Sequence, residues 1–292
     1  MKPAPFDYFA PSTLPEALEL LGEYGYDAKV LAGGQSLVPM MNFRLVQPAV
    51  LVDINRIPEL QGIQENKKSL RLGSMVRHVQ AERSSMVRER APLVYDAMPL
   101  IATSQVRNRG TLGGSLSHAD PSAELVVITT ALEANFRILS QEGERTLSAS
   151  EFFLGLLVTA MEPTELLVEI EIPYLPERTG WSLKEVSRRP HDFALSGAAA
   201  VLTLDRKDRV KNARLVYLSA GDGPVSAPQA AEMLRGELLT PELITAAAEK
   251  ASGEEIDPGS DIHASAEFRR HLANVLTRRA LEEAYQRARE DK

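Results

Sequence analysis

The 292-residue chain contains no cysteine. This absence excludes disulfides, thiolate nucleophiles, cysteine-based zinc sites and iron–sulfur clusters ligated by this chain. Aromatic residues are scarce, at 5%, and the formal net charge is −7, which does not supply the basic surface that nucleic-acid binding requires. We therefore expect no nucleic-acid partner, and any redox chemistry must proceed without sulfur ligands from this chain.

Long hydrophobic runs are also missing. The longest uncharged run, residues 30–43, is interrupted by two glycines and a proline, whereas a membrane-spanning helix needs about 18 or more apolar residues. The first residues, MKPAPFD, lack the charged-then-apolar layout of a signal peptide. These features predict a cytoplasmic protein without a membrane span.

The remaining composition, 44% hydrophobic and 25% charged, is typical of a globular protein, and the length suggests about two domains. The order of strand and helix patterns predicts an α+β fold. Residues 1–58 alternate strand and helix patterns and predict a small α/β unit, whose first helix is expected to begin at the capping-box pattern Thr13-Leu14-Pro15-Glu16. Residues 59–176 predict a larger unit with a mixed or antiparallel sheet, including helical character over 79–101. Together these two units would form one domain, 1–176, and the remainder, 177–292, would form a C-terminal three-stranded sheet with helices.

Two glycine-rich segments are the strongest candidates for a binding site. The first, Ala32-Gly33-Gly34-Gln35-Ser36-Leu37, directly follows an apolar strand, and the second runs from Gly110 to Ser117. Consecutive backbone N–H groups in such turns can form an anion-binding concavity, and glycine allows close approach of a ligand. Neither loop contains lysine, and both the Gly-Lys-Ser/Thr ending and the G-x-G-x-x-G fingerprint are absent.

Other chemistries find little support. The five histidines show no metal-ligand spacing, so we expect no metal site, and no G-x-S-x-G elbow indicates a hydrolase. Asp53 is interpreted as a turn residue at a strand end. Arg107 and Arg109 could each meet a phosphate or pair with a nearby carboxylate.

The two glycine segments, together with Leu51-Val52-Asp53-Ile54-Asn55 and Gln105-Val106-Arg107-Asn108-Arg109, resemble one family along essentially the whole chain. This is the family of FAD-binding medium subunits of molybdenum hydroxylases, which includes the carbon monoxide dehydrogenase medium subunit and the xanthine dehydrogenase flavin domain. The resemblance implies an FAD-dependent oxidoreductase subunit with no catalytic side chain of its own. It also implies a molybdenum-cofactor large subunit and a small subunit with [2Fe-2S] clusters as partners, assembled as a dimer of heterotrimers, and an external electron acceptor.

The resemblance also implies which residues contact FAD. Ala32, Gly33, Gly34, Gln35, Ser36 and Leu37 would hold the diphosphate from one side, and Thr111, Gly113, Gly114 and Ser115 from the other. Ser117, His118 and Glu124 would lie along the ribityl chain and flavin, with Glu124 replacing the usual aspartate. Ile101 and Ala102 would pack near the flavin or adenine, Lys184 would place a cation near the ring, and Asp192 and Phe193 would border it.

Two other functions stay open at this point. A stand-alone FAD-dependent oxidase or reductase would need its own acid or base in a substrate pocket, and the sequence offers no clear candidate. A non-catalytic nucleotide-binding module would need only the loops. The substrate of a molybdenum hydroxylase complex cannot be read from this chain.

Overall fold

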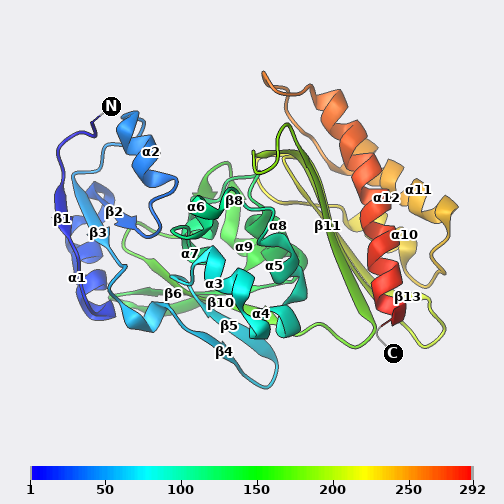
Figure 1. Ribbon diagram of the computed structural model, residues 1–292, viewed down its shortest axis with the longest axis horizontal. Helices are drawn as coiled ribbons and strands as arrows, with labels where there is room; N and C mark the ends of the chain where they lie inside the picture. Colours follow the sequence, from blue (N-terminus) through cyan, green and yellow to red (C-terminus); the bar gives the residue numbers. More distant parts are fainter. Residues whose placement is uncertain (1, 291–292) are drawn as a thin grey trace.

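The computed structural model describes residues 2–290, in which three sheets of three or more strands follow one another along the chain (Figure 1), beside a small two-stranded sheet. The first sheet contains β1 (Asp7–Phe9), β3 (Val50–Asp53) and β2 (Ala28–Leu31), paired in parallel in that order. Helix α1 (Leu14–Tyr24) begins at Thr13, whose side chain accepts a hydrogen bond from the Glu16 N–H, as the capping-box pattern predicted. Because parallel strands end at the same edge, the loops after β2 and β3 lie side by side.

The second sheet is antiparallel throughout, in the order β4 (Ile63–Glu65), β5 (Ser69–Gly73), β10 (Leu166–Pro173), β6 (Asn135–Ser140), β7 (Gly143–Ser148). Its connections contain α6 (Ser104–Arg107), α7 (Leu112–His118), α8 (Glu124–Ala131), α9 (Ala149–Phe152) and a hairpin of β8 (Phe153–Gly155) and β9 (Val158–Thr159). Short helical segments elsewhere are α2 (Leu37–Asn42), the 3₁₀ turns Gly25–Asp27 and Pro58–Leu60, and the π-helical turn Ala251–Glu255.

The expected helical region over 79–101 is divided into α3 (His78–Arg83), α4 (Ser85–Arg90) and α5 (Pro92–Ala97). Ser84 has an extended backbone and its hydroxyl accepts the Val87 N–H, so one helix ends there and the next begins. Pro92 lacks an N–H and therefore starts α5 rather than continuing α4.

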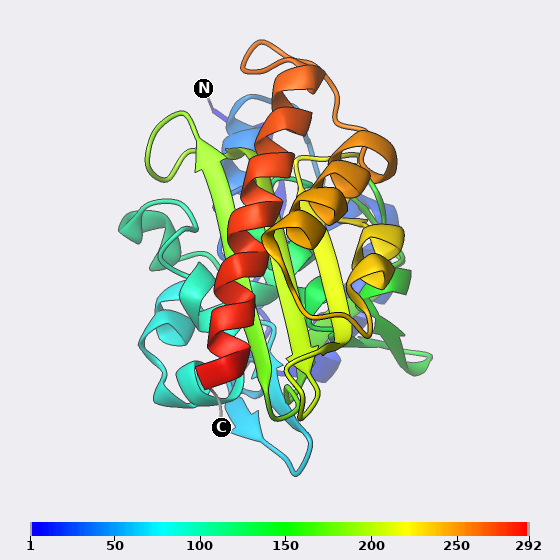
Figure 2. The same ribbon diagram turned by 90° about the vertical axis from the view of Figure 1, so that its right-hand side faces the viewer.

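The third sheet contains the three expected strands, as β11 (Thr179–Ser187), β12 (Ala194–Leu204) and β13 (Val210–Leu218), and is extended by the two-residue strand β14 (Val225–Ser226). Helices α10 (Pro228–Leu234), α11 (Pro241–Lys250) and α12 (Ala266–Glu290) cover its outer face, and Figure 2 shows α12 running along the strands. Alternate residues of β12 therefore enter two cores. Ala199 and Val201 pack with the second unit, and Ala198 and Ala200 pack under the helices.

The C-terminal sheet is thus tied to the second unit through buried apolar side chains and a few polar contacts. The indole Nε1 of Trp181 donates to Asp96 at 3.0 Å, and Arg287 donates to the same carboxylate at 2.7 Å. Across residues 2–290, none of the helices has the length and apolar character needed to cross a membrane.

Candidate functional site

The first glycine loop, residues 32–36, joins β2 to α2 and opens onto a cavity of about 330 Å³. The backbone of Gly34 has a φ of 72°, a conformation that side chains disfavour. Within residues 2–290, no group accepts a hydrogen bond from the backbone N–H groups of residues 33–36. These donors are therefore available to a ligand. The cavity is lined by Leu31, Ala32, Gly33, Gly34, Gln35, Val38, Pro39, Asp53, Asn55 and Arg109.

The second glycine loop has its own backbone donors engaged. The Gly113 N–H donates to the Ser74 carbonyl at 2.8 Å, and the Gly114 N–H donates to the Thr111 hydroxyl at 3.0 Å. The Ser115 N–H donates to the Thr111 carbonyl at 3.1 Å, as α7 begins. The sequence predicted that backbone N–H groups of the second loop would bind a ligand. Because the N–H groups of residues 113–115 are used within the protein, the second loop can instead offer a ligand the hydroxyls of Ser115 and Ser117.

The two loops touch each other through backbone atoms. A Cβ added to Gly33 would lie 2.5 Å from the Arg109 carbonyl oxygen and 2.8 Å from the Gly110 Cα, far inside van der Waals contact. A Cβ on Gly113 would similarly lie 2.7 Å from the Ser74 carbonyl oxygen. Only glycine fits at these positions, so the absence of side chains is what brings the first loop against the second.

Arg77 connects the two loops through hydrogen bonds, one to the Arg109 carbonyl directly before the second loop and one to Asn55, which contacts the first loop. Its guanidinium donates to the Arg109 carbonyl and to the Asn55 side-chain oxygen. The Asn55 amide in turn donates to the Ala32 carbonyl in the first loop at 2.8 Å. Asp53 supports Asn55, since its carboxylate accepts the Asn55 N–H at 2.9 Å and the Tyr8 hydroxyl at 2.5 Å.

His78 holds the second loop from inside the core. Its backbone N–H donates to the Gly110 carbonyl, and its Nε2 lies 3.1 Å from the Thr111 carbonyl oxygen, which requires a proton on Nε2. Burial lowers the pKa of His78 to about 4, so the ring is neutral at physiological pH. His78 is therefore a structural support for the loop.

Beyond the second loop, α7 leads to the seam between the second unit and the C-terminal sheet. Ser115, Ser117 and His118 lie on α7 and are half-buried, and Glu124 is the first residue of α8. Burial, together with the neighbouring Asp120, raises the pKa of Glu124 to about 7. Across the seam on β11, burial and the nearby Glu124 raise the pKa of Glu185 to about 8.

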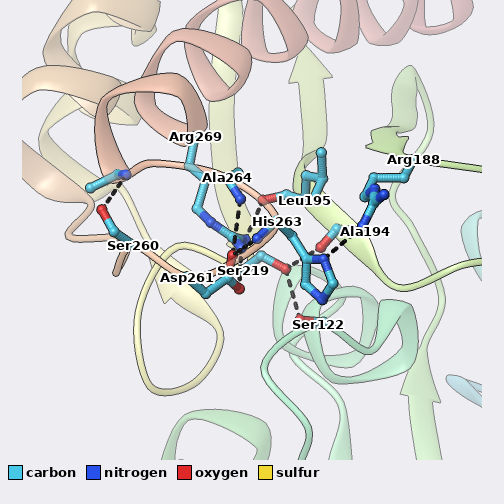
Figure 3. A network of polar contacts seen from close by, with 11 residues as sticks. Ser122, Arg188, Ala194, Leu195, Ser219, Ser260, Asp261, His263, Ala264 and Arg269 are labelled. Atoms are coloured by element: carbon cyan, nitrogen blue, oxygen red, sulfur yellow. Dashed lines mark hydrogen bonds and ion pairs between the residues drawn. The ribbon is translucent and has the colours of Figure 1, made fainter.

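A polar network holds this seam in place (Figure 3). The Ser219 hydroxyl donates to the Ala194 carbonyl at 2.7 Å and forms a hydrogen bond of 2.8 Å with the Ser122 hydroxyl, joining the loop before α8 to the start of β12. Arg269 donates to the Leu195 carbonyl and to Asp261, both at 2.7 Å. The backbone N–H groups of Ala264 and His263, and then Arg269, lower the pKa of Asp261 to about 2.

The structure separates Lys184 from the other candidates. Lys184 forms an ion pair with Glu283 of α12, on the outer face of the sheet. Its neighbour Glu185 faces the seam instead, because successive side chains of a strand point to opposite faces. In the described structure the Lys184 ammonium group, which was expected beside the flavin ring, instead pairs with Glu283.

The remaining candidates lie in two turns. Ile101 and Ala102 precede α6, and both carbonyls accept hydrogen bonds from the buried Arg107, which pairs with Glu82. Arg107 thus meets a carboxylate and two carbonyls, whereas Arg109 lines the cavity. Asp192 and Phe193 lie in the turn between β11 and β12, and the Phe193 side chain is 75% exposed.

Sequence reasoning missed Arg77, His78 and Asn55. Asn55 follows a strand end, directly beside the loop after a parallel neighbour, and this position could have identified it. Arg77 and His78 had no comparable signal, because their contacts depend on how α3 packs against the second loop.

Comparisons with known proteins bear directly on this site. A family model described as FAD binding domain in molybdopterin dehydrogenase matches residues 4–175, and one described as CO dehydrogenase flavoprotein C-terminal domain matches residues 181–284. The chain is 39% identical over 292 residues to 6-hydroxypseudooxynicotine dehydrogenase complex subunit alpha of Paenarthrobacter nicotinovorans, covering 100% of this chain and 98% of the relative. It is 40% identical over 288 residues to caffeine dehydrogenase subunit beta of a Pseudomonas species, covering 98% and 97%.

A solved structure of carbon monoxide dehydrogenase from Hydrogenophaga pseudoflava matches the fold with a TM-score of 0.95 at 39% identity, covering 98% of this chain and 99% of that one. This match confirms the predicted α+β fold class, and the family models confirm the predicted resemblance. The chain therefore belongs to the family of FAD-binding medium subunits of molybdenum hydroxylases and is an FAD-dependent oxidoreductase subunit.

Proposed function

We propose that this chain is the electron-transfer subunit of a molybdenum hydroxylase complex. In this proposal its FAD receives electrons from [2Fe-2S] clusters on a small partner subunit and passes them to an external acceptor such as a quinone, NAD or oxygen. A large partner subunit with the molybdenum cofactor would oxidise the substrate. The observation that carries the proposal is the direct backbone contact between the two glycine loops beside unengaged N–H donors.

The residues present fit an FAD diphosphate. The N–H groups of Gly33, Gly34, Gln35 and Ser36 supply donors from the first loop, and Arg109 supplies a positive charge at the cavity wall. In the proposed pose the Ser115 hydroxyl approaches from the second loop. When bound, the isoalloxazine supplies the redox chemistry, while the protein contributes position and electrostatics.

In this proposal the large partner subunit, and not this chain, determines which substrate the complex oxidises. The relatives named for 6-hydroxypseudooxynicotine and for caffeine are almost equally similar to this chain, at 39% and 40% identity. A carbon monoxide dehydrogenase chain reaches the same 39%. The sequence identity to this chain is therefore nearly the same for relatives named for different substrates. This supports an electron-transfer role that the subunits share whatever the substrate is.

The proposal is tested by expressing the chain with and without its genomic neighbours and recording absorption spectra. We expect a flavin spectrum, release of FAD on denaturation, and co-purification with one large and one cysteine-bearing small subunit. Reduction of the flavin by substrate should occur in the complex and not in the isolated chain. A colourless protein that takes up no added FAD would refute the proposal, and turnover of an organic donor by the isolated chain would favour a stand-alone oxidase or reductase.

A further inference from the structure

Two carboxyl groups, those of Glu124 and Glu185, lie at the seam between the second unit and the C-terminal sheet. The side chains of Trp181 and Leu183 on β11 pack with the core that contains α8, whereas Ser182 and Lys184 contact Glu283 of α12. By the same alternation Glu185 points toward α8, where Glu124 is the first residue. Burial and the charge of Glu124 both raise the pKa of Glu185, as expected for two carboxyl groups at the same seam.

Within residues 2–290, no cation is among the charged groups that shift the pKa values of this pair. Glu185 Oε2 is buried and has no hydrogen-bond partner in the part of the chain that the structure describes. The charged groups that act on the pair are themselves acidic: Glu124 acts on Glu185, and Asp120 acts on Glu124. A buried carboxylate without a partner is costly, so such a group binds a proton more readily than an exposed carboxylate does.

The nearby basic groups have other partners or lie elsewhere. Lys184 and Arg287 pair with Glu283 on the outer side of β11, and Arg287 also binds Asp96 of α5. Arg188 contacts His263, and Arg269 binds Asp261. On the inner side of the sheet, His118 is the last residue of α7, and the turn that follows it leads to Glu124 at the start of α8.

The position of the pair matters if FAD binds as proposed above, and the inference rests on that proposal. The cavity beside the first loop lies on the side of the N-terminal sheet and has room for the nucleotide end of the cofactor. From the second loop, α7 leads the other way, past Ser115 and Ser117, to the start of α8. The flavin end would therefore reach the seam that contains Glu124 and Glu185.

We propose that Glu124 and Glu185 together take up one proton from solvent when the bound FAD is reduced and release it when the FAD is reoxidised. The balance is two electrons from an iron–sulfur donor, one proton from solvent onto the flavin, and one proton from solvent onto the carboxyl pair. On reoxidation both electrons pass to the acceptor, and the flavin proton and the carboxyl proton are released to the acceptor or to solvent. The added negative charge of the reduced flavin favours the protonated pair, since like charges raise the proton affinity of a carboxylate.

The experiment is a redox titration of the FAD-loaded complex with mediators at pH 8 and pH 9. Each proton taken up per two electrons changes the equilibrium constant tenfold per pH unit, or about 30 mV per pH unit for a two-electron couple. We expect about 59 mV per pH unit for the unmodified protein and about 30 mV per pH unit for Glu185→Gln. Glu283→Gln, on the opposite face of the same strand, is the matched control and should keep the steeper slope.

A second measurement needs no variant. The reduced-minus-oxidised infrared difference spectrum at pH 8.5 should gain the C=O band of a protonated carboxylic acid, and this band should shift in D₂O. Equal slopes in the unmodified protein and Glu185→Gln, or the absence of a carboxylic acid band, would overturn the role of the pair while leaving the proposed function intact. Failure of the protein to bind FAD would overturn both.

Discussion

Replacing Gly33 with alanine should separate the two glycine loops and weaken FAD binding. The added methyl would lie 2.5 Å from the Arg109 carbonyl oxygen, whereas ordinary contact begins at 3.4 Å. The first loop must therefore move by about 0.9 Å away from the second. Because the obstructing atoms are backbone, no side-chain rotation can relieve the contact.

The size of the effect follows from hydrogen-bond geometry. A donor at 2.9 Å from a phosphate oxygen that moves by about 0.9 Å passes beyond the distance at which a hydrogen bond forms. Hydrogen bonds to charged groups contribute about 1.5–3 kcal/mol each. Losing one or two of them should raise the Kd for FAD about 10-fold to more than 100-fold. The overpacking itself should lower the free energy of unfolding by about 1–3 kcal/mol.

The assay is titration of FAD-stripped protein with FAD, followed by flavin fluorescence and by calorimetry. Gly223→Ala is the control, because a Cβ at Gly223 meets no atom within 4 Å. The control should bind FAD as the unmodified protein does. If Gly33→Ala binds FAD within twofold of that control, the loop contact does not position the cofactor and the reasoning is refuted.

Three further changes test the supports around the site. Arg77→Met removes the link between the loops, so FAD affinity should fall about tenfold, whereas the exposed Arg83→Met on the same helix should leave it unchanged in the same titration. Because the pKa of His78 is about 4 in the folded chain and about 6.5 in the unfolded chain, the unfolded chain binds more protons between these values, and stability should fall by about 3 kcal/mol as the pH drops from 6.5 to 4. Urea unfolding across this range should show a flatter profile for His78→Gln, and an identical profile would contradict the assignment. Arg269→Met leaves the buried Leu195 carbonyl without its donor and should lower the free energy of unfolding by about 1–3 kcal/mol, measured by thermal unfolding against the exposed control Arg279→Met.

Much of the architecture could be predicted because it depends on local patterns. The capping box at Thr13 marked the start of α1, and the apolar runs marked the strands of the first and third sheets. The division at Ser84 was missed, although Pro92 was a visible signal for a new helix. The strand β14 has two residues and pairs with only part of β13, so no periodicity could indicate it.

The site could be predicted only in part, for a different physical reason. The glycine loops were visible because an absence of side chains is written directly in the sequence. Which side of β11 faces the seam depends on strand register, and this distinguishes Glu185 from Lys184. Arg77 and His78 contact segments that are more than 20 residues away in the sequence. His78 also binds a main-chain carbonyl, which any residue could offer, so the sequence carries no signal for that contact.

The two loops resemble each other in sequence but differ in what they can give a ligand. The first keeps its N–H groups unengaged, while the second uses the N–H groups of Gly113 and Gly114 to hold its own shape against Ser74 and Thr111. A cofactor diphosphate would thus accept hydrogen bonds from the backbone N–H groups of the first loop. The second loop would contact it without offering the N–H groups of Gly113 and Gly114. Recognition through neutral donors releases few counterions, so it depends on salt far less than recognition by lysines would. The lack of lysine in the first loop is consistent with its geometry: there is no space for a side chain at Gly33, so this position can offer the ligand only its backbone N–H.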